Sequence, residues 1–148
     1  MSAKRNEHVS NPVVGLDQAL LERLMVLRRW FHQHPELSFQ EADTAHRIIA
    51  ELERLGVSYK YPGVGHAVIA YIEGLDSPAR AIGLRADLDA LPGNETTGAI
   101  YASERPGIMH ACGHCVHMAM LIGAANLLTE KPPPGPVRGK RHPSSRPE

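Results

Sequence analysis

An eight-residue segment, 110–117, contains three of the nine histidines and both cysteines of the chain. Its sequence is HACGHCVH, in which Cys112 and His114 alternate, so an extended loop can direct both side chains at one ion. Thiolate and imidazole are ligands that zinc and other late transition metals accept. A catalytic zinc site needs about three protein ligands and a structural one about four, so this pair predicts a metal site that needs further ligands. Local candidates for these are Cys115, His110 and His117.

The same segment has two alternative interpretations. Cys112 and Cys115 form a C-x-x-C motif at the start of a predicted helix, where the helix dipole lowers a thiol pKa, so a thiol-disulfide redox module is one alternative. Redox motifs of this kind belong to a thioredoxin-like βαβ unit and usually follow an aromatic residue, whereas this chain has Ala111 there. The other alternative is a pair of free cysteines among surface histidines that bind no metal.

A second candidate site is the carboxylate pair Asp87 and Asp89, at the carboxyl end of a predicted strand. Residues two apart on an extended chain face the same side, so both side chains can point into a crevice beyond the strand. Carboxylates in such a place bind a hard cation, orient a metal-ligating histidine or cap the next turn. The simpler alternative is a turn in which one aspartate pairs with Arg85.

Helices and strands alternate along the chain in a way that predicts one α/β layer structure. Apolar residues at helical spacing predict a helix from Leu16 to near His34, because Pro35 prevents its continuation. A second helix is predicted from Glu41 to Leu55, and the apolar run Met118 to Leu128 predicts a buried third one. Short strands are expected over 57–61, 67–72 and 79–86.

Composition divides the chain into a polar lead-in, 1–15, one domain, 16–130, and a tail, 131–148. The tail holds six of the twelve prolines and five basic residues against one acid, so we expect it to be disordered. The whole chain balances 16 basic against 16 acidic residues, which gives no reason to expect nucleic acid or a membrane as partner. Without a secretory signal or a membrane-length apolar run, a cytoplasmic location is expected.

Three segments, in this order, resemble the N-terminal part of the M20 family of metallo-amidohydrolases. The most similar subgroup contains hippurate hydrolases, indole-acetyl-amino-acid hydrolases and N-acyl-amino-acid amidohydrolases. The segments are LRRWFHQHPELSF (27–39), GLRADLDALP (83–92) and PGIMHACGH (106–114). The resemblance runs from about Leu20 to Arg138 and implies the N-terminal part of a metallopeptidase-like catalytic domain, with a central sheet flanked by helices.

The resemblance also implies a site and a reaction. Cys112 and His114 match metal-ligating residues of the family, and Asp87 matches the aspartate that supports the metal site. The family binds two divalent ions, commonly zinc or manganese, which activate a shared water to attack an amide carbonyl. The expected ligand is a small-molecule N-acyl amino acid.

The chain departs from the family pattern in three places. The segment PGNETTG (92–98) stands where the family has an apolar residue and Gln-Glu-Glu. Cys115 and Val116 stand where the family has aspartate and glycine; the first change removes an acceptor, and the second forbids a positive φ. After Arg138 the family continues into a strand with two adjacent glutamates, a general base and a metal ligand, followed by further histidine ligands and a dimerisation domain. Here a basic decapeptide, 139–148, follows, as an out-of-frame end would. We therefore expect a truncated, inactive form or a non-catalytic metal-binding fragment.

Overall fold

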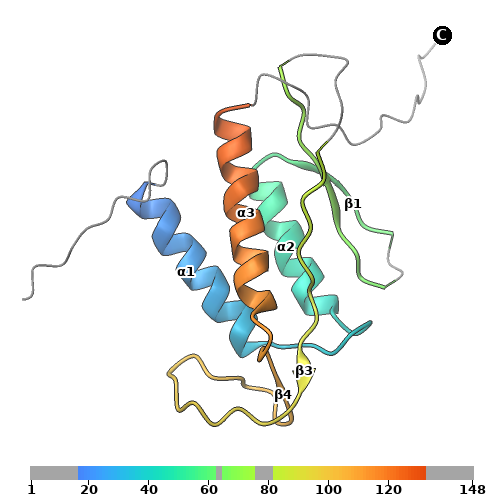
Figure 1. Ribbon diagram of the computed structural model, residues 1–148. Coiled ribbons are helices and arrows are strands. Elements are labelled where there is room, and N and C mark those ends of the chain that lie inside the picture. The colour runs from blue at the N-terminus through green and yellow to red at the C-terminus, as the bar shows by residue number, and fades with distance from the viewer. Residues whose placement is uncertain (1–16, 63–64, 76–81, 133–148) are drawn as a thin grey trace, which may run out of the picture.

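The computed structural model describes residues 17–62, 65–75 and 82–132. The predictions for the lead-in 1–15 and for nearly all of the tail 131–148 therefore lie outside the described residues. The described part combines helices and strands in one body (Figure 1). Among the described residues, no helix is long and apolar enough to cross a membrane.

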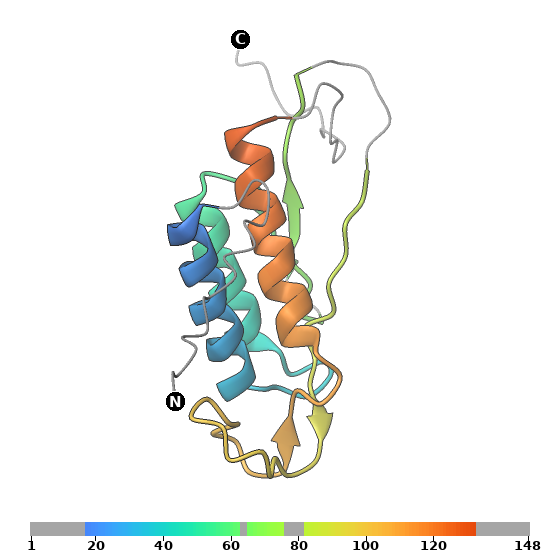
Figure 2. The same cartoon turned by 60° about the vertical axis from the view of Figure 1, so that its left-hand side comes forward.

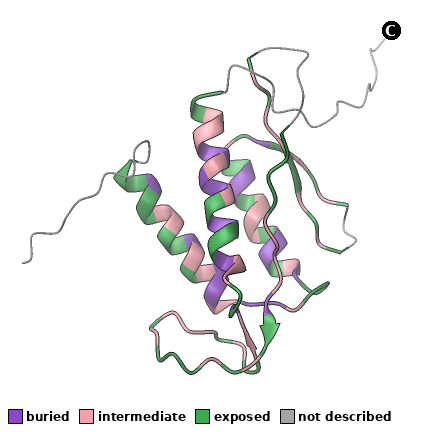
Figure 3. Cartoon of the chain, viewed as in Figure 1, coloured by how far each residue is buried: buried purple, intermediate pink, exposed green. Residues whose placement is uncertain are grey.

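Three helices form the larger part of the fold: α1 (Gln18–Gln33), α2 (Ala42–Arg54) and α3 (His114–Glu130). Helix α3 lies between the other two and contacts both (Figure 1). Apolar residues of α1 and α3 meet along this contact, and the buried faces of the helices point at each other (Figure 3). The residues of this core are Leu27, Phe31, Cys115, Met118 and Ile122. All three predicted helices are confirmed.

Local chemistry sets the helix ends. The Asp17 side chain accepts a hydrogen bond from the Leu20 N–H at 2.6 Å and so caps the first turn of α1. Beyond the C-terminal end of α1, the buried carboxylate of Glu36 accepts the N–H groups of Asp43 and Thr44, at 3.2 and 2.8 Å. Glu36 thereby satisfies free N–H groups in the first turn of α2 from outside that helix.

The described strands form two small antiparallel sheets. In the first, β1 (Ser58–Lys60) pairs with β2 (Ile69–Tyr71), and Ser58 lies opposite Tyr71. In the second, β3 (Leu91–Pro92) pairs with β4 (Ile108–Met109). The first two predicted strands are confirmed, whereas β3 and β4 were not predicted.

The third predicted strand, 79–86, is wrong over the residues that the structure describes. Residues 79–81 lie outside the described part, and 82–86 are extended but unpaired within it. Alternating apolar residues identify an extended segment, yet a strand also needs a hydrogen-bonded neighbour. A groove separates this segment from β2, so the neighbour is missing on that side.

The three segments singled out in the sequence meet at one end of the helices. The backbone N–H of Ala90 donates to the backbone oxygen of Glu36 at 2.7 Å, and Leu37 forms a parallel β-bridge with Ala90. The pair β3–β4 then places the segment before α3 beside the segment 83–92. Figure 2 shows β3 and β4 at the N-terminal end of α3, where the candidate metal ligands lie.

Candidate metal centre

The loop with Cys112 leads directly into α3. Gly113 is the N-cap residue of that helix and has the left-handed backbone angles φ 85° and ψ 11°. Its carbonyl oxygen accepts the N–H groups of Val116 and His117, which closes the first turn. Cys112 is exposed just before this turn, and His114 is the first residue of the helix. The predicted position of the pair at a helix N-terminus is confirmed.

Asp89 fixes the orientation of the His114 ring. The His114 Nδ1 lies 2.9 Å from the Asp89 backbone oxygen and 3.1 Å from its side-chain Oδ1. A backbone oxygen only accepts, so Nδ1 carries a hydrogen, and in this tautomer of the neutral ring Nε2 has the lone pair that a metal needs. A metal-ligating histidine is commonly held in this way through its other ring nitrogen.

Asp87 and Asp89 have different partners in the structure. Asp87 forms an ion pair with Arg85 at 2.5 Å, as the simpler interpretation of this segment predicted, and both groups are exposed to solvent. Asp89 instead reaches His114 across 25 positions of the sequence. The assignment of Asp87 as the support of the metal site stays a prediction.

A buried polar chain lies behind the loop. Cys115 is 1% exposed, and its Sγ lies 3.5 Å from His32 Nδ1. His32 Nε2 in turn lies 3.1 Å from both carboxylate oxygens of Glu95. This chain connects α1, α3 and the loop after β3, so it holds the N-terminal end of α3 in place. The His32 ring therefore has a structural partner on each side.

The environment of Glu95 keeps it ionised. Its side chain is 3% exposed and accepts hydrogen bonds from the Thr97 hydroxyl, the Ser103 N–H and His32. The bond from Thr97 is the largest cause that lowers the Glu95 pKa, to about 2; the Ser103 N–H and His32 add to it, while burial opposes it. A carboxylate with so low a pKa and three donors is a weak base.

His110 is buried without a partner among the described residues. It is 4% exposed, and neither of its ring nitrogens has a hydrogen-bond partner there. Its pKa is lowered from 6.5 to about 4, mainly by burial, and the charges of His32 and His114 contribute to this shift. His110 is therefore neutral at pH 7, which is the protonation state a metal ligand requires.

The described residues near the loop offer ligand types that suit a divalent metal, but too few ligands to hold one. Cys112 offers an exposed thiol and His114 an oriented ring nitrogen, both suited to zinc. Within the described ranges, however, no three His, Cys, Asp or Glu side chains group in a way that could hold an ion. His117 lies near His114, with ring centroids 5.9 Å apart, and does not complete such a group.

The redox alternative finds no support. Both cysteines are free, and Cys115 is buried in the core. Burial raises the pKa of the Cys115 thiol, whereas a redox-active pair needs a thiolate of lowered pKa.

Val116 lies within α3, so a positive φ is not required at this position. The replacement of the family glycine therefore causes no backbone strain here.

The structural roles of three residues in the site region were not predicted from the sequence: Glu95, Ser103 and Glu36. Glu95 and Ser103 lie in the loop between β3 and β4, where no periodic pattern predicts which side chains turn inward. Glu36 belongs to the recognised segment 27–39, but its role as a helix cap depends on a contact seven and eight residues ahead. Only the presence of an acid before the second helix could have indicated it.

Comparison with known proteins identifies the family. The sequence profile of peptidase family M20/M25/M40 matches residues 83–138. N-acetyl-L-cysteine deacetylase of Bacillus subtilis is 47% identical over 122 residues, 82% of this chain and 28% of that protein. The crystal structure of Bacillus subtilis YXEP protein, a dinuclear metal binding peptidase from the M20 family, matches with a TM-score of 0.75 and 44% identity, over 78% of this chain and 32% of that chain. This chain belongs to peptidase family M20.

A plant relative of this M20 chain is IAA-amino acid hydrolase ILR1-like 4 of Arabidopsis thaliana, 46% identical over 104 residues, 70% of this chain and 23% of that protein. The chain thus spans between 23% and 28% of the length of these two curated relatives. The predicted family and the mixed α/β class are confirmed. Because the structural neighbour binds two metal ions, the comparison supports divalent metals as the cofactor class of the family.

Proposed function

We propose that this M20 chain binds a divalent metal ion, zinc or manganese, through Cys112 and His114. The observation that carries the proposal is the contact of Asp89 with His114 Nδ1, which leaves Nε2 free two residues from an exposed thiol. Such a pair supplies part of a site for metal-assisted amide hydrolysis. A divalent ion held by Cys112 and His114 would supply Lewis-acid polarisation of the amide carbonyl and activation of water.

The substrate class that we propose is an N-acyl amino acid. The names of two relatives refer to an IAA–amino acid and to N-acetyl-L-cysteine, and both compounds are amino acids with a group on the amino nitrogen. The relatives are more than three times as long as the matched region, so the proposal concerns the reaction to which these residues contribute.

We further propose that the 148 residues alone do not hydrolyse this amide. Each described carboxylate near the loop already has a partner: Asp89 holds His114, Asp87 pairs with Arg85, and Glu95 accepts three hydrogen bonds. None of the three is thus free to act as a general base, which must reach the proton that it removes.

Zinc binding by the purified chain, measured by calorimetry, tests the ligand assignment. Cys112→Ser and His114→Gln should each weaken binding at least about tenfold, because each removes one donor of a small set. His66→Gln is the matched control, since His66 pairs with Tyr61 far from the loop and should leave binding unchanged. Equal binding by all four proteins would contradict the assignment.

The proposed inactivity is tested by incubating the chain with hippurate or N-acetyl-L-cysteine in the presence of zinc or manganese. We expect no turnover above the metal-only blank. Turnover that Cys112→Ala abolishes would show that the chain is an active hydrolase and would overturn the proposed inactivity.

A further inference from the structure

Three arginines, one from α1 and two from α2, converge on one buried carboxylate. The side chain of Glu51 is 3% exposed, and its Oε2 lies 2.6 Å from Arg23 Nη2 and 3.2 Å from Arg54 Nε. The third arginine is Arg47, whose Nη2 lies 3.6 Å from Glu51 Oε1. Among the described residues, Glu51 is the only acid that pairs with any of the three. This arginine cluster therefore has a formal excess of two positive charges.

Arg47 has hydrogen-bond donors to spare. Its distance of 3.6 Å from Glu51 is too long for a hydrogen bond, and its buried Nε has no hydrogen-bond partner in the described part of the chain. The guanidinium is nevertheless held in place, because its Cζ lies 5.3 Å from the centroid of the Trp30 ring. The Trp30 ring is itself stacked on His34, with centroids 4.4 Å apart. A guanidinium that is already fixed loses little side-chain entropy when it binds an anion.

From these features we propose that the arginine cluster binds a phosphate group, carried by free phosphate or by a small phosphate monoester. Guanidinium groups present paired N–H donors whose geometry matches the oxygens of a phosphate. A phosphate monoester carries about 1.5 to 2 negative charges at pH 7, which matches the excess of two positive charges. A single carboxylate carries one negative charge and would leave the other positive charge uncompensated.

The partial burial of the arginines favours an anion that stays bound. Their side chains are 39%, 35% and 39% exposed for Arg23, Arg47 and Arg54, so each is open to a ligand on one side only. Water and salt screen the repulsion between such half-buried charges less than between fully exposed ones. A dianion at the cluster would relieve this repulsion and would link α1 to α2.

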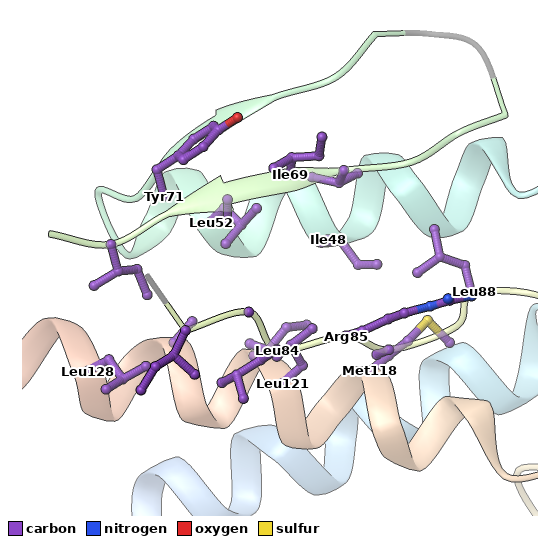
Figure 4. A pocket seen from close by; sticks show the side chains of 18 residues that line it. Ile48, Leu52, Ile69, Tyr71, Leu84, Arg85, Leu88, Met118, Leu121 and Leu128 are labelled. Carbon is purple, nitrogen blue, oxygen red and sulfur yellow. The ribbon is translucent and has the colours of Figure 1, made fainter. Parts of the chain in front are cut away.

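The cluster is separate from the other features of the structure. Figure 4 shows Ile48 and Leu52 of α2 beside the apolar groove between β2 and the segment 82–88, and none of the three arginines lines that groove. The candidate metal ligands Cys112 and His114 belong to α3 and the loop before it. Phosphate binding therefore goes beyond the proposed metal binding, and either can fail without the other.

Calorimetric titration of the full chain with inorganic phosphate tests the proposal. EDTA is present throughout, since it removes metal ions to which phosphate could otherwise bind. We expect saturable binding, at least about tenfold tighter than the binding of acetate at equal ionic strength. Glycerol 3-phosphate as a second titrant distinguishes the two sources of the phosphate group. Tighter binding than that of inorganic phosphate indicates a monoester as the ligand, and equal or weaker binding indicates free phosphate.

Three variants separate the cluster from general attraction of anions. Arg47→Gln and Arg54→Gln should each weaken phosphate binding at least about tenfold, because each removes one charged donor group. Arg85→Gln is the matched control, since it removes the same charge from a side chain that is 86% exposed and lies outside the cluster. The control should bind phosphate as the wild type does. If circular dichroism shows that Arg47→Gln has lost its helices, Arg54→Gln alone decides the comparison.

Thermal unfolding provides a second measurement. Phosphate at ten times its Kd should raise the Tm of the wild type by about 3–6 °C, since it binds the folded state, and should raise that of Arg54→Gln by less. The proposal is overturned by a lack of saturable phosphate binding, by equally tight binding of acetate, or by equal phosphate binding of Arg54→Gln and the wild type. None of these results bears on metal binding by Cys112 and His114.

Discussion

The Nδ1 atom of His114 lies 2.9 Å from the backbone oxygen of Asp89 and 3.1 Å from its carboxylate. This contact joins the end of the segment 83–92 to the first residue of α3. It selects the tautomer of the histidine and aims the other nitrogen at the loop that carries Cys112. Two of the segments recognised in the sequence thereby become one candidate site.

Removal of the Asp89 side chain should weaken metal binding. Because the backbone oxygen still holds the ring, Asp89→Ala should lower zinc affinity by about tenfold, the smaller end of the range for partners of metal ligands. Calorimetry of Asp89→Ala beside Asp87→Ala measures the difference. An unchanged Asp89→Ala with a weakened Asp87→Ala would instead support the assignment of Asp87 from the sequence.

The two thiols should react at very different rates. Cys112 is exposed, whereas Cys115 is 1% exposed and burial raises its pKa, so little of its reactive thiolate is present. With a chromogenic disulfide reagent, the native chain should release the equivalent of one fast thiol, and the unfolded chain two. Cys112→Ser should remove the fast phase. Two fast thiols in the native chain would contradict the burial of Cys115 and revive the redox alternative.

Glu95 should make stability depend on acid. Its pKa falls from 4.5 to about 2 on folding, mainly through the Thr97 hydroxyl, with help from Ser103 and His32. The folded state then binds fewer protons than the unfolded one, so this contribution is present above pH 4.5 and is lost as the pH falls toward 2. In urea unfolding, the free energy of unfolding should fall less between pH 4.5 and pH 2 for Glu95→Gln than for the wild type.

The matched control for this experiment is Glu22→Gln, since Glu22 is exposed and its side-chain contact in the described part of the chain is with Gln18. The free energy of unfolding of this control should fall with pH as much as that of the wild type. If Glu95→Gln also follows the wild-type curve, the carboxylate does not titrate with a lowered pKa.

Substitution of Gly113 by alanine should lower the stability of the fold. Its φ of 85° costs an L-residue about 1–2 kcal/mol, so Gly113→Ala should lower the free energy of unfolding by about 1 kcal/mol. Gly83→Ala is the control, because Gly83 has a φ outside the left-handed region and no atom within 4 Å of an added Cβ. Equal effects of the two substitutions in urea unfolding would argue against the left-handed N-cap.

The helices could be predicted from the sequence because local signals define them. Leu27 and Phe31 repeat at helical spacing and form the core contact, and Pro35 stops α1 as expected. The strands were harder to predict, since a strand exists only through its neighbour. Residues 82–86 have the pattern of a strand but face a groove, and β3 and β4 are too short to show a pattern.

The candidate site was predictable in its ligands but not in their support. Cys112 and His114 stand out by residue type and spacing alone. Alternation places Asp87 and Asp89 on one side of the chain, yet only packing decides which of them reaches His114. The link from Cys115 through His32 to Glu95 spans 83 and 63 positions of the sequence, and no local pattern reports such contacts.

The most direct test of the central claim is the absorption spectrum of the chain titrated with cobalt(II), which substitutes for zinc. A thiolate ligand produces a sulfur-to-metal charge-transfer band, and Cys112 and Cys115 are the only cysteines that could give it. We predict that Cys115→Ser retains this band and that Cys112→Ser abolishes it. A band that survives in Cys112→Ser, or no band in the wild type, would contradict metal binding through Cys112.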